Sequence, residues 1–272
     1  MSQTRIRDAG IELSLRATLD QRRGTAGHLL NPSDMMRFSA TIRAIPGDTE
    51  SVLDVGCGLG VLTDCLAALG YRATGVDIDQ DAMQHMTSPS DVGSISALPY
   101  PSMTFDTVIA NEILEHLPVA HYEGARRELA RVASRSIVVT VPNGEPLDAA
   151  TTRCPRCTCI YSLHGHVRRF DRTDLADLIP GFGLAGVSTA GPYKVRHRSI
   201  EWYAKRRGMG RWPSRAGVTC PQCGFVQPGS SETTEFGASG STGGKVARTI
   251  LGFPWSRWWF VSVYRRVELG KE

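Results

Sequence analysis

The sequence predicts an α/β protein with a mostly parallel sheet and helices on both faces. Short β-branched runs alternate with helical patterns at least four times between residues 46 and 142. A glycine-rich turn, "DVGCGLG", joins the first such run to the helix that follows it. With 272 residues, 41% of them hydrophobic, the chain can bury a core of ordinary size.

The first expected element is a helix over residues 31–45, where Asn31 suits the N-cap and Pro32 the first helical position. The run "SVLDV" then enters the glycine turn, and "VLTDCLAALG" continues as a helix that ends at Gly70. The runs "YRATGVDID", "FDTVIANE" and "SIVVTVPN" predict further strands. One helix and one strand return in 169–190, and "RWWFVSVYRRVE" alternates like a final strand.

The alternation stops after Pro142, which predicts a core with two insertions. Both insertions follow strands of the parallel sheet, so both are expected to leave from its carboxyl edge. Within the second, "GSSETTEFGASGSTGG" predicts a loop. The expected segments are a helical cap (1–45), the main core (46–142), a first insertion (143–168), a core helix and strand (169–190), a basic second insertion (191–256) and a final core strand (257–272).

The sequence also indicates where the protein is located and what charge its partner carries. No apolar run approaches the ~20 residues of a membrane span, and the charged N-terminus does not resemble a signal peptide. A cytoplasmic location is expected, where seven cysteines would not form a disulfide set. Residues 191–219 contain eight lysines and arginines but one acid, Glu201. This surface favours an anionic partner, and the alternative is a solvated face.

The turn after the first strand is the first candidate site, because ligands of open parallel sheets bind beyond the carboxyl ends of the strands. It lacks the third glycine of a dinucleotide fingerprint, since that position, counted from Gly56, is Val61. Asp54 would repel a diphosphate but suits an ammonium and a sulfonium. Asp77, which ends the second strand, can accept both hydroxyls of a ribose. A ribose without phosphates and with a cationic tail describes S-adenosylmethionine (SAM).

The ordered motifs "VLDVGCGLG", "GVDID", "ALPYPSMTFDTVIANEILEHLP" and "SIVVTVPNGEP" resemble those of class I SAM-dependent methyltransferases. Within that class they are similar to the small-molecule branch that includes ubiquinone-biosynthesis enzymes. The resemblance covers roughly residues 50–190 and the last strand. It implies a Rossmann-like seven-strand sheet with the last strand antiparallel, and a SAM-binding core at 46–142.

The resemblance also implies which residues bind the cofactor. The methionine end of SAM would contact Asp54, Gly56, Gly58 and Gly60, with Asn111 beside it. Asp77 would bind the ribose, and Ile78 would lie against adenine. The family usually carries Asp where this chain has Ser94, so adenine would be bound by the backbone around Ile95, or more loosely.

Methyl transfer depends mainly on positioning and desolvation, and it needs a base only when the acceptor carries a proton of high pKa. The motif "NEILEHLP" places Glu112, Glu115 and His116 after the fourth strand, and His116 is the candidate base. In the competing interpretation, Glu115 and His116 are structural residues that cap the next segment.

Two motifs, "CPRC" at 154–157 and "CPQC" at 220–223, are typical of a four-thiolate zinc site. If both insertions leave the same sheet edge, the two pairs can meet over one metal. We therefore predict a structural zinc ion bound by Cys154, Cys157, Cys220 and Cys223. A redox pair and coincidence are the alternatives. The remaining candidates are Cys159, His164 and His166 as substitute or outer-shell groups, with Cys57 and Cys65 as packing residues.

The leading hypothesis is an enzyme that methylates an O or N atom of a small, anionic or carrier-linked metabolite. A second hypothesis gives the methyltransferase an RNA substrate, because Trp202, Tyr203 and Trp212 interleave with the basic residues. A third makes the zinc element a docking module on a non-catalytic core, which the intact Asp54 and Asp77 oppose.

Overall fold

The structure, a computed structural model, describes residues 3–21, 32–147, 151–195, 212, 217–228 and 255–267. The chain divides into two compact units. Unit 1 comprises Met1–Asn143, Asp171–Pro192 and Arg257–Glu272, and unit 2 comprises Gly144–Phe170 and Tyr193–Ser256. The six-segment division expected from the sequence stays a prediction. Most of the basic run 191–219 lies outside the described residues. The Gly/Ser/Thr-rich run lies outside them entirely.

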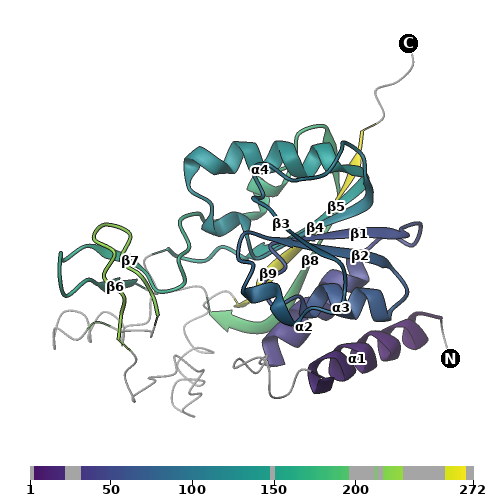
Figure 1. Ribbon diagram of the computed structural model, residues 1–272, viewed down its shortest axis with the longest axis horizontal. Coiled ribbons are helices and arrows are strands. Elements are labelled where there is room, and N and C mark those ends of the chain that lie inside the picture. The colour runs from purple at the N-terminus through teal and green to yellow at the C-terminus, as the bar shows by residue number, and fades with distance from the viewer. Residues whose placement is uncertain are drawn as a thin grey trace. The chain divides into compact units, whose positions relative to one another are not determined.

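Unit 1 is built on a seven-stranded sheet with the order β3-β2-β1-β4-β5-β9-β8 (Figure 1). The neighbouring pairs among β1 to β5 are parallel, whereas β9 is antiparallel to β5. The predicted seven-strand sheet with an antiparallel last strand is confirmed. Its strands are β1 (Ser51–Val55), β2 (Arg72–Asp77), β3 (Ser90–Val92), β4 (Phe105–Asn111), β5 (Ala133–Pro142), β8 (Phe182–Val195) and β9 (Trp255–Arg266).

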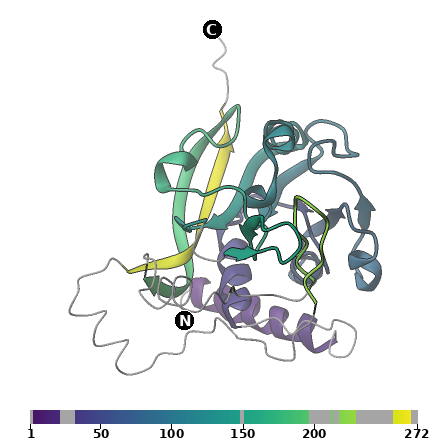
Figure 2. The ribbon, with the colours of Figure 1, turned by 90° about the vertical axis from the view of Figure 1, so that its left-hand side faces the viewer.

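Strands β8 and β9 lie side by side at one end of this sheet (Figure 2). The N–H of Val267 donates to the carbonyl of Gly181, and the guanidinium of Arg257 donates to the carbonyl of Gly191. These contacts show that β8 runs antiparallel to β9, and hence parallel to β5. Each of the two chain segments of unit 2 therefore follows the carboxyl end of a sheet strand, as expected for the insertions.

Helices cover both faces of the sheet, with α1, α2 and α3 on one face and α4 on the other (Figure 1). Helix α2 begins at Pro32, in agreement with the sequence, and its Phe38 and Ile42 pack into the core. In the described residues, no helix is both long and apolar enough to cross a membrane. The helices are α1 (Gln3–Gln21), α2 (Pro32–Ala44), α3 (Val61–Ala68) and α4 (Val119–Val132), with short 3-10 turns η1 (Ala82–His85), η2 (Leu114–His116) and η3 (Arg172–Leu175).

The helix expected in 169–190 is only the single turn η3. Asp171 and Asp174 cap this turn reciprocally, which satisfies its first N–H groups. Pro180 and Gly181 follow soon after, and Gly181 has a φ of +75°, so a helix here could not continue past residue 179.

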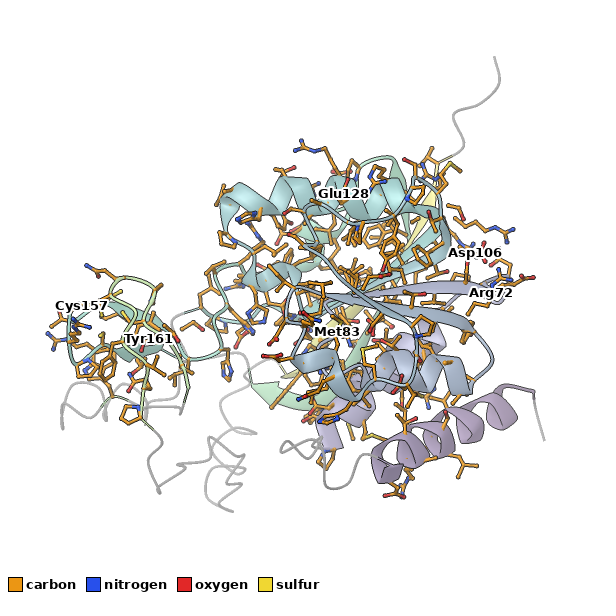
Figure 3. The ribbon with its side chains drawn as sticks, in the orientation of Figure 1. Arg72, Met83, Asp106, Glu128, Cys157 and Tyr161 are labelled. Carbon is orange, nitrogen blue, oxygen red and sulfur yellow. The ribbon has the colours of Figure 1, made fainter. Side chains whose placement is uncertain are left out.

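Unit 2 contains two small antiparallel elements. Strands β6 (Thr151–Arg153) and β7 (Ile160–Ser162) form a hairpin around the first CPxC motif. A bridge between Thr219 and Val226 closes the chain around the second motif. Figure 3 shows Cys157 and Tyr161 within this unit.

Candidate functional site: the glycine turn, its cavity and a four-cysteine cluster

The turn between β1 and α3 requires its glycines. Gly56, Gly58 and Gly60 have φ values of +70°, +51° and +70°, which L side chains rarely adopt. A Cβ atom on Gly56 would lie 2.5 Å from Cδ1 of Ile113, whereas nothing lies within 4 Å of the Cβ position of Gly58. The turn is thus closed on one side and leaves open space at Gly58.

The carboxylate of Asp77 is aligned by two backbone groups. The N–H of Gly58 donates to Oδ2 at 2.7 Å, and the N–H of Asp79 donates to Oδ1 at 3.0 Å. A carboxylate has about four acceptor positions, so capacity remains for further donors. Asp77 thereby joins the end of β2 to the glycine turn and keeps a charged acceptor at the carboxyl edge.

A cavity of about 270 Å³ opens beside this turn. Five of the predicted cofactor residues line it, namely Gly56, Asp77, Ile78, Ser94 and Ile95. Five other residues, to which the sequence assigned no binding role, complete the lining: Val55, Gly93, Ile113, Leu117 and His121. They become neighbours only through the fold, because η2 and the start of α4 return over the ends of β1 and β2. Ile113 and Leu117 belong to the motif "NEILEHLP", but no pattern in the sequence predicted that they line the cavity.

Asp54 is buried at the end of β1, with 2% of its surface exposed. Thr63 Oγ1 donates to its Oδ2 at 2.7 Å. Burial raises the pKa of Asp54 to about 7, and the charge of Asp77 adds to this effect, while Thr63 and Arg37 oppose it. A cationic ligand group near this carboxyl would favour its ionised form.

Asn111, the last residue of β4, has a buried Oδ1 atom without a hydrogen-bond partner in the described structure. Such an atom requires an explanation, and a ligand donor is one. Ser94, where the family usually has Asp, forms a 2.9 Å hydrogen bond with the hydroxyl of Ser96. The side chain of Ser94 is thus occupied locally, which fits backbone recognition around Ile95.

His116 ends the turn η2 and is exposed. The cavity is lined by its neighbours Ile113 and Leu117 but not by His116 itself. The neighbouring Glu115 is fully buried. The role of His116 as a base stays a prediction.

Comparison with known proteins gives a family for this site. Residues 53–137 match the family model described as a methyltransferase domain. A ubiquinone biosynthesis O-methyltransferase from Glaesserella parasuis is 29% identical over 109 residues, which cover 35% of this chain and 45% of that protein. The matched segment holds the glycine turn, Asp77 and Asn111. The chain contains a class I SAM-dependent methyltransferase domain.

Two further comparisons extend the methyltransferase match. A Mycobacterium tuberculosis protein named "probable S-adenosylmethionine-dependent methyltransferase" is 30% identical over 151 residues, 52% of this chain and 51% of its own. The chain spans about half the length of these curated relatives. A crystal structure from Bacillus halodurans C-125, of a protein named as a methyltransferase, has a TM-score of 0.51 at 12% identity and covers 85% of this chain and 99% of its own. This last likeness concerns the fold alone.

Outside the methyltransferase core, unit 2 brings the four predicted cysteines together. The sulfur atoms of Cys154 and Cys223 are 3.6 Å apart, as are those of Cys157 and Cys220. All four sulfur atoms lie within 4.8 Å of one another. A tetrahedral ion with bonds of ~2.3 Å to sulfur separates its ligands by ~3.8 Å. The donor set and its spacing fit one tetrahedral thiophilic ion.

The two CPxC motifs have the same backbone hydrogen bonds. The N–H of Cys154 donates to the carbonyl of Cys159, and the N–H of Cys220 donates to the carbonyl of Phe225, both at 2.8 Å. The residues that follow the second cysteine of each motif, Thr158 and Gly224, have φ values of +62° and +69°. The motifs are therefore two copies of one metal-binding turn, and Thr158 adopts a conformation that favours glycine.

The cysteine sulfurs also receive backbone donors. Burial raises the pKa of Cys220, but the N–H groups of Gln222 and Cys223 and the neighbouring thiols outweigh it and bring the pKa to about 6. Burial also acts to raise the pKa of Cys154, but backbone N–H groups outweigh it, so the pKa is lowered. The N–H of Cys159 acts to lower the pKa of Cys157, but burial and the neighbouring thiols outweigh it and raise that pKa to about 12. Thiolates are the metal-binding form, so the loop geometry prepares Cys154 and Cys220 in particular for a cation.

Proposed function

We propose that this protein is a SAM-dependent methyltransferase that acts on an O or N atom of a small molecule. The observation that carries the proposal is the position of Asp77, aligned by Gly58 and Asp79 at the wall of the 270 Å³ cavity. An anion held at the end of the second strand suits a ribose, and no phosphate group needs to be accommodated beside it.

In this proposal, different residues bind different parts of the cofactor. Asp77 accepts hydrogen bonds from the ribose, and Asp54 and Asn111 favour the ammonium end. Ile78 lies against the adenine, which the backbone around Ile95 recognises. When bound, SAM supplies a sulfonium methyl group that an acceptor lone pair can displace in line. The chain's own contribution is to orient the two reactants and to exclude water between them.

The acceptor is proposed to be small, and anionic or carrier-linked. Support for the negative charge comes from the basic composition of 191–219. If the acceptor atom carries a proton of high pKa, His116 is the proposed base. A cytoplasmic location follows from the proposed thiolate site, because thiolates persist in a reducing compartment.

The second part of the proposal is a structural zinc ion in unit 2. The buried cluster of this unit consists of Cys154, Tyr161 and Cys220, with Cys157, Cys159, Val218, Cys223 and Phe225 packed against it. A core made so largely of cysteines has little apolar surface to bury, so a metal would supply much of its stability. Four thiolates leave no open coordination position, which favours a structural role over a catalytic one.

Isothermal titration calorimetry with SAM and S-adenosylhomocysteine (SAH) tests the first part. We expect micromolar affinity or better for both, and methyl transfer from labelled SAM to a small-molecule fraction of a cell extract. Binding of neither ligand would overturn the proposal. Transfer of the label to RNA alone, lost on ribonuclease treatment, would favour an RNA substrate instead.

A further inference from the structure

We infer that Arg37, Glu112 and Trp259 form a clamp that positions the wall of the SAM cavity. This "Glu112 clamp" rests on the proposed function, because its purpose is to hold the cofactor site. Its members come from three separate elements: α2, the residue after β4, and β9. Glu112 is inferred to be a positioning residue, since it acts through the residues on either side of it.

The backbone of Glu112 adopts a conformation that L side chains rarely adopt. Its φ is +58°, in the left-handed region. Non-glycine residues remain in this region when their surroundings hold them there, and such residues concentrate at functional sites. The N–H of Glu112 donates to the carbonyl of Thr140 at 2.9 Å, which fixes one side of this turn.

The side chain of Glu112 fixes the other side. The indole Nε1 of Trp259 donates to Oε2 of Glu112 at 2.6 Å, and Nη1 of Arg37 lies 3.9 Å from the same oxygen. The guanidinium of Arg37 also lies 5.3 Å from the centre of the Trp259 ring. The side chains of Arg37 and Glu112 are only 13% and 17% exposed, so these attractions are weakly screened by solvent.

The indole of Trp259 is itself held in place. Gly191 of β8 has a φ of +83°, and a Cβ atom there would lie 2.5 Å from Cζ3 of Trp259. Trp258 contacts the same indole edge to face, with ring centres 5.5 Å apart. The close approach of Gly191 and the contact with Trp258 leave the ring little freedom, so its N–H is a fixed donor for Glu112.

The residues on either side of Glu112 belong to the proposed cofactor site. Asn111 precedes it and carries the unpartnered buried Oδ1 atom. Ile113 follows it, lines the cavity and occupies the space that a side chain on Gly56 would need. The reversal of the chain at Glu112 therefore sets the directions of Asn111 and Ile113 together. The clamp connects this bend at Glu112 to helix α2.

The test compares variants of the full chain by SAH calorimetry, at a temperature where circular dichroism shows each to be folded. Glu112→Gln keeps an acceptor for the indole N–H, and we expect its SAH affinity to stay within about threefold. Glu112→Ala and Glu112→Gly lose the acceptor, and we expect at least tenfold weaker binding in both, although glycine tolerates the left-handed backbone. Trp259→Phe should weaken binding to a similar extent. Asp48→Asn, which removes an exposed carboxylate paired with Arg265, is the matched control.

Hydrogen exchange of the ligand-free protein gives a readout independent of cofactor. Amides of 111–114 should exchange faster in Glu112→Ala and Trp259→Phe but not in Glu112→Gln. Unchanged SAH affinity in Glu112→Ala, or full affinity in Glu112→Gly, would overturn the clamp while leaving the methyltransferase proposal intact. Failure of the unmodified chain to bind SAH would overturn both.

Discussion

The backbone N–H of Gly58 donates a 2.7 Å hydrogen bond to Oδ2 of Asp77. This bond joins the turn after β1 to the end of β2, two neighbouring parallel strands. It makes the glycine turn and the acid one structural unit: the turn orients the carboxylate, and the carboxylate satisfies a turn N–H. A substitution of either residue therefore affects both.

Asp77→Ala should weaken SAH binding strongly. Hydrogen bonds to a charged group are each worth ~1.5–3 kcal/mol, so the loss of even one corresponds to a decrease in affinity of ~10- to 150-fold. Calorimetry measures the change. Asp79→Ala is the control, because within the described part of the chain the Asp79 side chain accepts the N–H groups of Asp81 and Ala82 in the adjacent turn. Equal affinities of Asp77→Ala and the unmodified chain would contradict the assignment of the ribose site.

Gly56→Ala should lower both stability and SAH affinity. The new Cβ would lie 2.5 Å from Cδ1 of Ile113, and the φ of +70° disfavours any side chain. Overpacking and left-handed strain together are expected to cost roughly 2–4 kcal/mol of unfolding free energy. Denaturant unfolding checks this value. The control is Gly47→Ala, where nothing lies within 4 Å of the Cβ position, and it should change stability by less than about 1 kcal/mol.

Asp54 should make SAH affinity depend on pH. Burial raises its pKa to about 7, so below pH 7 the free protein holds a proton that an ammonium-bearing ligand must displace. Affinity should therefore rise from pH 6 to pH 8 and level off above that range. Proton release, measured by calorimetry in buffers of different ionisation enthalpy, should be larger at pH 6 than at pH 8. A pH profile that persists unchanged in Asp54→Asn would assign the effect to another group.

The raised pKa of Asp54 also predicts how the free energy of unfolding changes with pH. The pKa of Asp54 is higher in the folded chain than its ordinary value of 3.8, so the folded state binds the extra proton between about pH 4 and pH 7. The contribution of Asp54 to stability is thus fully present below about pH 4 and is lost as the pH rises to about 7. Over this range the unfolding free energy of Asp54→Asn should fall less with pH than that of the unmodified chain. Chemical denaturation at several pH values checks this difference.

Purified protein should contain about one zinc ion per chain, as one four-cysteine site requires. Cys220→Ser should release the metal and loosen unit 2, whereas the sheet of unit 1 should stay folded and keep SAH affinity within about threefold. Elemental analysis and hydrogen exchange measure the two effects. Cys159→Ser is the matched control, since Cys159 is outside the group of four, and it should retain zinc. Zinc-free protein with a well-ordered unit 2 would refute the structural role of the metal.

Local patterns in the sequence predicted the parts of the site that depend on backbone chemistry. The glycines after β1 were expected to form a tight turn, and they have positive φ values. The acids at the ends of β1 and β2 lie beside that turn. The CPxC motifs were expected to meet, and their sulfur atoms lie within 4.8 Å. The turn geometry was predictable because it rests on a short segment whose residues leave few backbone alternatives. The meeting of Cys157 and Cys220, 63 positions apart, was predicted instead from the shared sheet edge at which both insertions begin.

The sequence by itself determined the alternation of strands and helices, the glycine turn with Asp54 and Asp77, and the pairing of the two cysteine motifs. Tertiary structure alone decided that Ile113 and His121 line the cavity and that Trp259 donates to Glu112, 147 positions away. The reason is physical. Periodicity and turn chemistry act over a few residues, whereas contacts between distant side chains depend on the strand order, which places β9 beside β5 and the end of β4 beside both α2 and β5.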